Sequence, residues 1–213
     1  MIGSFNVKTF GLSKLRNQLA MGYIEQIIRR YDVVFIMEIR DSSGTLIPSV
    51  LNILNTKDEG WNVTYSERLG LDSSSYREQY AYYYRTDHLT LLDSYQYDDG
   101  VDDGTDAFSR EPFGVLFQSS HIEALKEFGL VGVHIDPDKV AEEMDALPEV
   151  IQDAEGHWDT KNIMLMGDLN ADCSYISKQK LSDLRLRTDS SYLWLIGDEV
   201  DTTVSSTDCA YDR

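Results

Sequence analysis

The sequence lacks any long apolar run. Nowhere do about 18 apolar residues follow one another, which is the length that a membrane-spanning helix needs. The first residues, MIGSFNV, also lack the pattern of a signal or transit peptide, and they are typical of a first β-strand. We therefore expect no membrane segment. If the protein is secreted, its signal has been removed or replaced by Met1.

Basic residues are scarce. The chain has 19 lysines and arginines against 37 aspartates and glutamates, which gives a formal net charge of -18. This balance argues against a protein that coats nucleic acid through a basic surface. It does not exclude an enzyme that meets phosphate through bound cations, because excess carboxylates are what hard divalent ions require.

Cysteine is nearly absent as well. The two cysteines, Cys173 and Cys209, are compatible with two free buried thiols in a reducing compartment or with a single disulfide in an oxidising one. The cysteine count alone leaves both readings open.

What is present is a mixed order of strand and helix signals. Ser13 is a candidate helix cap, and apolar residues recur every four positions after it, at Leu15, Leu19, Tyr23, Ile27 and Tyr31. Further helices are predicted over 46–54, with Pro48 in the first turn, and over 139–154, where Pro148 is expected to kink or end the helix. Strands are predicted over 1–5, 32–37, 80–84, 89–97, 113–117, 128–133 and 162–166.

This order predicts an α/β (mixed α+β) fold in which two packed sheets are flanked by helices. The 213 residues contain no internal repeat, low-complexity tract or linker, so we expect a single domain over 1–213.

Polar side chains follow four of the apolar strands. Asn6 follows the first, Glu38 and Arg40 the second, His134 a third, and Asp168 and Asn170 a fourth. In a layered fold such strand ends can meet at one rim, where carboxylate and amide oxygens suit Mg²⁺, histidine suits proton transfer and arginine suits phosphate.

Each of these residues also has a structural reading. An aspartate after a strand is commonly a turn former or a helix cap, a single histidine is commonly structural, and Glu38 with Arg40 could be a solvated pair. Because polar residues follow four separate strands, a shared site for metal-assisted hydrolysis is favoured over an independent structural role for each.

Motifs along the whole chain support a more specific reading. They are SFNVKTFG (4–11), RRYDVVFIMEIRDS (29–42), SYREQY (75–80), SYQYDDG (94–100), FSREP (108–112), MGDLNADCSY (166–175), RLRT (185–188), WLIGD (194–198), DTT (201–203) and CAYDR (209–213). In this order they resemble the deoxyribonuclease I family of secreted enzymes, within the endonuclease/exonuclease/phosphatase superfamily. FSREP, DCSY and CAYDR together point to the deoxyribonuclease I branch.

The resemblance implies a four-layer α/β sandwich. It also implies endonucleolytic cleavage of DNA to 5′-phosphorylated products, dependent on Mg²⁺ (or Mn²⁺) and aided by Ca²⁺, in a secreted, monomeric protein. A minor groove read by one arginine and one tyrosine reports groove width more than base identity, so low sequence specificity is expected.

Catalytic and metal-binding roles follow from the same resemblance. His134, paired with Glu78, matches one of the family's two acid/base histidines, and Asp212 matches the carboxylate that orients the other. The groups that match those holding the metal and the scissile phosphate are Asn6, Glu38, Asp168 and Asn170.

The DNA contacts and the disulfide are implied in the same way. Arg40 and Tyr76 match side chains that enter the minor groove, while Arg110 and Tyr211 match phosphate contacts. Cys173 and Cys209 match the family's stabilising disulfide, which favours the bridge over free thiols.

Two calcium sites are also implied. The ligands of one would be Asp201, Thr203 and Thr207. Those of the other would be Asp99, Asp106, Phe108 through its carbonyl, and Glu111.

Two of the chain's departures from the family bear on its function. It stops at Arg213, where the family continues through further strands to a Ser-Asp-His motif with the partner histidine of Asp212 and another metal-site aspartate, so we expect a C-terminally incomplete domain whose activity needs testing. The segment Asn62 to Tyr65 lacks the Val-Val pair that docks actin in the family, so we expect weak or no actin binding.

Two other functions are compatible with the sequence. The chain could be a catalytically impaired binding module on the same scaffold, or another phosphoesterase of the superfamily. Every catalytic position present in the chain carries the active residue type, which disfavours the first, and FSREP and CAYDR disfavour the second.

Overall fold

Two four-stranded mixed β-sheets form the centre of the molecule in the computed structural model, which describes residues 1–70, 76–100, 106–122 and 125–213. The first sheet has the order β1 (Ile2–Phe10), β2 (Val33–Ile39), β4 (Gln79–Arg85) and β3 (Trp61–Tyr65). The second has the order β5 (Leu89–Gln96), β6 (Phe113–Ser119), β7 (Glu127–His134) and β8 (Ile163–Asp168). The pairs β1–β2 and β7–β8 are parallel, and the other neighbours are antiparallel.

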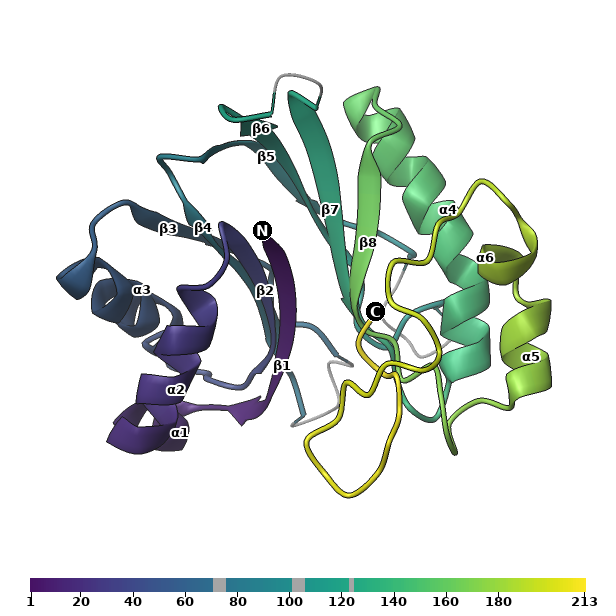
Figure 1. Cartoon of the computed structure of the whole chain (residues 1–213), viewed down its shortest axis with the longest axis horizontal. Coiled ribbons are helices and arrows are strands. Elements are labelled where there is room, and N and C mark those ends of the chain that lie inside the picture. The colour runs from purple at the N-terminus through teal and green to yellow at the C-terminus, as the bar shows by residue number, and fades with distance from the viewer. Residues whose placement is uncertain (71–75, 101–105, 123–124) are drawn as a thin grey trace.

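Helices cover the outer face of each sheet (Figure 1). The first sheet is covered by α1 (Leu12–Arg16), α2 (Gln18–Ile28) and α3 (Leu46–Lys57). The second is covered by α4 (Val140–Trp158), α5 (Lys178–Asp183) and α6 (Arg185–Thr188). The predicted sandwich of two mixed sheets between helical layers is therefore confirmed. No helix in the described part of the chain has the length and apolarity to cross a membrane.

The strand β2 shows why its sequence is apolar without alternation. Phe35 and Met37 pack between the sheets, whereas Val34 and Ile36 pack against the helices of the first sheet. Because both faces of the strand are buried, every position needs an apolar side chain. Gly132 in the facing sheet leaves room for Phe35, since a Cβ there would lie 2.3 Å from the Phe35 ring.

The first predicted helix is wrong in its boundaries and in its buried face. The chain forms two helices separated at Asn17, and Asn17 caps the second by accepting a hydrogen bond from the Ala20 N–H, so Ser13 is not the cap. Leu19 and Tyr23 are 70% and 60% exposed. A spacing of four advances about 40° around a helix at each step, so such a series rotates away from the core within a few turns.

Other boundaries also differ from the predictions. The strand predicted to end at Phe5 continues as β1 to Phe10, the helix predicted to end at Leu54 continues to Lys57, and α4 continues through Pro148 to Trp158. Ser75, the first residue of the SYREQY motif, lies outside the described residues.

Beyond α6 the chain has no regular helix or strand, yet it returns to the second sheet. Gly167 and Arg213 exchange both of their backbone hydrogen bonds, at 2.9 and 2.8 Å, and Asp168 forms a β-bridge with Asp212. A disulfide joins Cys173 to Cys209, with the two Cα atoms 6.0 Å apart. The expected bridge is therefore confirmed, and it closes a loop with a sequence separation of 36.

We predict that replacing both cysteines, by Cys173→Ser with Cys209→Ser, lowers the free energy of unfolding by about 3–4 kcal/mol, because the open loop gains entropy in the unfolded chain. Urea unfolding followed by circular dichroism measures the loss. A reductant should destabilise the wild type and leave the double variant unchanged. Equal midpoints for the two proteins would contradict the prediction.

Candidate active site at the rim of the two sheets

Four of the six polar residues predicted from the strand ends, Asn6, His134, Asp168 and Asn170, meet at one rim formed by both sheets. Asn6 belongs to β1 in the first sheet and Asp168 ends β8 in the second, and the Asn6 Nδ2 donates to Asp168 Oδ2 at 3.0 Å. Met37, which pairs with Asn6 in the first sheet, also reaches Asp168, with its sulfur 3.3 Å from the Asp168 amide nitrogen. The rim thus lies where β1 and β8, the edge strands of the two facing sheets, approach each other.

His134 and Glu78 form a buried pair across the sheets. His134 Nδ1 lies 2.8 Å from Glu78 Oε1, and Glu78 is fully buried. The carboxylate places a hydrogen on Nδ1, so the Nε2 atom presents its lone pair when the ring is neutral. His134 Nε2 lies 4.0 Å from Asp168 Oδ2, which aims the ring at the rim.

The backbone of His134 is fixed from two sides. Its N–H donates to the Tyr80 hydroxyl at 3.0 Å, and its carbonyl accepts from Arg110 Nε at 3.0 Å. Arg110 also lies 3.6 Å from Glu78 Oε1. The contact of Tyr80 with His134 was not predicted from the sequence. The spacing of two between Glu78 and Tyr80 could have indicated it, because residues two apart in an extended segment lie on the same face.

Glu38 lies in a strained part of its strand. Its φ is +56°, and the facing residues Lys8 and Thr9 in β1 have φ of 34° and 56°, conformations that are uncommon for residues other than glycine. The Thr9 N–H donates to Glu38 Oε2 at 2.6 Å. Both strands lose regular register here. The prediction that Asn6 and Glu38 follow the ends of strands is therefore wrong, because both lie at irregularities within β1 and β2.

The GDLN segment turns sharply after β8. Asn170 has φ +49°, its N–H donates to Asp168 Oδ1 at 3.1 Å, and its Nδ2 donates to the Ile135 carbonyl at 2.9 Å. These bonds hold Asn170 against Asp168, whose carboxylate accepts from Asn6. The donor set of Asn6, Glu38, Asp168 and Asn170 consists of carboxylate and amide oxygens, which fits a hard divalent cation.

Asp212 lies opposite Asp168 in the returning segment. Burial, together with the negative charge of Asp168, raises the pKa of the Asp212 carboxyl to about 7. Its Oδ1 is buried and has no hydrogen-bond partner within the described ranges. The Asp212 N–H donates to the Thr202 hydroxyl at 3.0 Å.

The residues expected to contact DNA are also near this rim. The Arg40 guanidinium lies over the Tyr76 ring, 3.4 Å from its centroid. Burial, and then the negative charge of Glu38, raises the pKa of the Tyr76 hydroxyl. The Tyr211 carbonyl accepts from the Leu169 N–H at 2.9 Å, and the Tyr211 ring packs against Tyr175, with ring centroids 5.3 Å apart.

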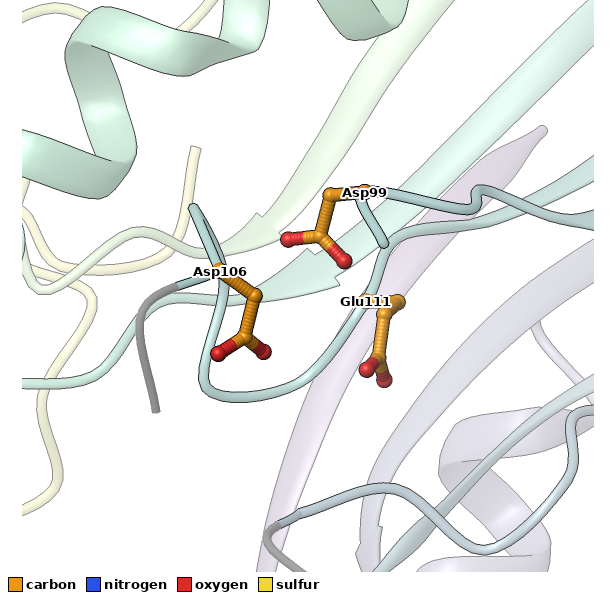
Figure 2. A group of neighbouring side chains, drawn as sticks. All are labelled: Asp99, Asp106 and Glu111. Carbon is orange, nitrogen blue, oxygen red and sulfur yellow. The ribbon is translucent and has the colours of Figure 1, made fainter. Parts of the chain in front are cut away.

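A separate acidic cluster contains Asp99, Asp106 and Glu111, whose carboxylate groups converge in Figure 2. One oxygen from each lies within 4.8 Å of the others, a separation compatible with ligands of a single Ca²⁺ ion. Burial, and then the charge of Asp106, raises the pKa of Asp99. The Phe108 N–H donates to Asp99 Oδ2 at 2.8 Å, so Phe108 is positioned beside the cluster.

The second expected calcium group gathers in an exposed loop. Asp201 Oδ1 accepts from the Thr203 N–H at 2.9 Å and from the Thr203 hydroxyl at 2.8 Å, and the Thr203 hydroxyl lies 2.5 Å from the Thr207 carbonyl. The three residues are therefore adjacent, with their oxygens engaged in mutual hydrogen bonds.

Comparisons with known proteins all match the chain to the same family. Residues 3–213 match the model of the Endonuclease/Exonuclease/phosphatase family. The chain is 45% identical over 214 residues to Deoxyribonuclease-1 of Bos taurus, covering 100% of this chain and 75% of that relative. It is 44% identical to Deoxyribonuclease gamma of Mus musculus, covering 99% and 68%.

Solved structures show the same fold at low identity. An endonuclease/exonuclease/phosphatase family protein from Bacteroides thetaiotaomicron superposes with a TM-score of 0.56 at 18% identity, covering 85% of this chain and 66% of that chain.

The raised pKa of Asp212 predicts a pH-dependent stability in the metal-free protein. A carboxyl with a folded pKa of about 7 and an ordinary value of 3.8 stabilises the fold while protonated. This contribution is complete below the ordinary value and is lost as the pH rises to the folded value. Asp212→Asn should therefore gain stability over the wild type between about pH 4 and about pH 8, by about 4 kcal/mol at most.

Urea unfolding of both proteins in EDTA across this range measures the difference. Asp208→Asn, at an exposed position in the same segment, serves as the control and should follow the wild type. Parallel pH profiles for Asp212→Asn and the wild type would contradict the prediction.

Proposed function

The chain belongs to the deoxyribonuclease I branch of the endonuclease/exonuclease/phosphatase family, and on that premise we propose that it hydrolyses DNA phosphodiester bonds as a divalent-metal-dependent endonuclease. The observation that carries the proposal is the buried Glu78–His134 pair, which directs a histidine ring nitrogen toward Asp168. Phosphodiester hydrolysis needs an activated water, stabilisation of negative charge on the phosphate, and protonation of the leaving oxygen.

His134 is the group that moves a proton at Nε2. Glu78 fixes the ring tautomer through Nδ1 and stabilises the charged imidazolium, because it is a buried carboxylate 2.8 Å away. Tyr80 and Arg110 hold the histidine backbone, so the ring enters the reaction already oriented. Asp212 matches the carboxylate that orients the family's second acid/base histidine, and we assign it the same orienting role.

Asn6, Glu38, Asp168 and Asn170 would hold Mg²⁺ or Mn²⁺ together with the scissile phosphate. Bound there, the cation offsets the negative charge that develops on the phosphate oxygens. The strained backbone at Glu38 and Thr9 supports this role, since such conformations cluster at functional sites.

Arg110 and Tyr211 supply phosphate contacts, and the stacked Arg40 and Tyr76 enter the minor groove. A guanidinium already stacked on an aromatic ring loses little entropy on binding. Contacts of this kind follow groove width rather than base identity, which accounts for low sequence specificity. The expected products carry 5′-phosphates.

We extend the proposal to Ca²⁺ and to secretion. The converging carboxylates of Asp99, Asp106 and Glu111, and the adjacent oxygens of Asp201, Thr203 and Thr207, would hold structural Ca²⁺. The disulfide between Cys173 and Cys209 supports an oxidising, extracellular location. Weak or absent actin binding and a monomeric state stay predictions.

The alternatives are less well supported. A binding module would not need the intact pair of Glu78 and His134. Another phosphoesterase is disfavoured because relatives with 45% and 44% identity are named deoxyribonucleases.

Nicking of supercoiled plasmid tests the proposed function. The purified chain with Mg²⁺ and Ca²⁺ should relax the plasmid, and EDTA should abolish the activity. His134→Ala should lower the rate by at least about 10²-fold, because it removes a general acid/base.

His157→Ala is the matched control and should retain the wild-type rate, since His157 lies on α4 and bonds Asp93 on β5. A folded wild-type chain that does not nick DNA in any metal condition would overturn the proposal.

Calcium binding at the Asp99 cluster predicts a thermal shift. Saturating Ca²⁺ should raise the melting temperature of the wild type by mass action. Asp99→Asn should lose part of this rise because it removes one of three converging carboxylates, whereas the exposed neighbour Asp98→Asn should keep it. Differential scanning calorimetry measures both shifts, and an undiminished rise in Asp99→Asn would be evidence against this site.

A further inference from the structure

A fully buried carboxylate lies behind the catalytic histidine. Glu143, in the first turn of α4, has no exposed surface. Its Oε1 accepts from the Ser109 N–H at 3.0 Å and its Oε2 accepts from the Asp136 N–H at 2.9 Å. One side chain therefore ties together two segments that are distant in the sequence.

These two segments carry the groups that act at the rim. Ser109 directly precedes Arg110, and Asp136 follows His134 by two residues. The Arg110 Nε in turn donates to the His134 carbonyl at 3.0 Å. Glu143, Arg110 and His134 thus close a ring of contacts in which each segment is held to the other.

We propose that Glu143 is a positioning residue for the nuclease reaction, which acts by fixing the relative placement of Arg110 and His134. The inference rests on the proposed function. It assigns a role to a residue that contacts the backbone of both segments and lies on a different element from the catalytic pair.

The requirement for a carboxylate at this position follows from the donors that it meets. Two backbone N–H groups point at it, so both side-chain atoms must be acceptors, and only an ionised carboxylate offers two. Burial raises the pKa of Glu143, and the positive charge of Arg110 opposes that rise. Glutamine has the same shape, but its amide nitrogen would face one of the N–H donors and leave a buried hydrogen bond unmade.

The other contacts of the His134 backbone do not replace this link. The Ile135 N–H donates to the Asp168 carbonyl at 2.9 Å and the Ile135 carbonyl accepts from Asn170, so these bonds connect the segment to the second sheet alone. Glu143 and Arg110 join it to the Ser109 segment, and a hydrogen bond between the Asp136 carboxylate and Ser109 adds a third link between the same two segments.

A double-mutant cycle with His134 tests the proposal. Glu143→Gln should lower kcat for plasmid nicking by about 10- to 100-fold in the wild-type background, because a small displacement of the acid/base group is costly. In the His134→Ala background the same change should have an effect of less than about twofold on kcat, since a residue that acts through another shows strong coupling with it. KM is measured alongside, and the larger effect is expected in kcat.

Glu142→Gln is the matched control, because Glu142 is exposed in the same helical turn, and it should keep the wild-type kcat in both backgrounds. Circular dichroism checks that each variant is folded. If Glu143→Gln does not fold, Glu143→Asp carries the same cycle, since aspartate keeps the charge but is too short to reach both N–H groups.

Two results would overturn the proposal. One is an unchanged kcat in the folded variant, and the other is an equal loss in both backgrounds, which would show a merely structural role. A wild-type chain without metal-dependent nicking, measured first, would instead refute the proposed function.

Discussion

The close packing of the two sheets against each other is the constraint on which the site depends. The hydrogen bonds at the rim join the sheets: Asn6 to Asp168, and His134 to both Glu78 and Tyr80. None of these residues could form its contact if the sheets slid or separated. The apolar layer between the sheets, with Phe35, Tyr82 and Phe113 at its centre, therefore sets the geometry of a site that is itself polar.

The same packing explains why a protein with a net charge of -18 can handle a polyanion. Most lysines and arginines are exposed or partly exposed elsewhere on the surface, but two arginines are held near the rim by neighbouring residues. Arg110 is buried between Glu78 and the His134 carbonyl, and Arg40 is held on the Tyr76 ring. In the proposed function, fixed guanidinium groups of this kind, together with a cation held by the nearby carboxylates, would act on a phosphate at short range, where charge is least screened.

The sequence predicted most strands and the layered fold because buried strands leave a simple signature. In β2 both faces are covered, and seven successive residues are buried. The helical stripe from Leu15 to Tyr31 was misleading because a repeat of four is not the period of a helix, and the cap at Asn17 interrupts it. The positive φ values at Thr9 and Glu38 could not be predicted, since neither residue favours that conformation and only tertiary contacts impose it.

The site residues that could not be predicted from the sequence are those that contact the His134 segment through its backbone atoms. Tyr80 and Glu143 hold the His134 segment by accepting from its N–H groups, and any sequence in that segment would supply such donors. The disulfide illustrates the same principle at longer range. Cys173 lies three residues after Asn170 and Cys209 three residues before Asp212, so the bridge fastens the irregular return of the chain beside Asp168. By restricting that return, the bridge stabilises the fold and places a carboxylate at the rim, where no helix or strand is available to do so.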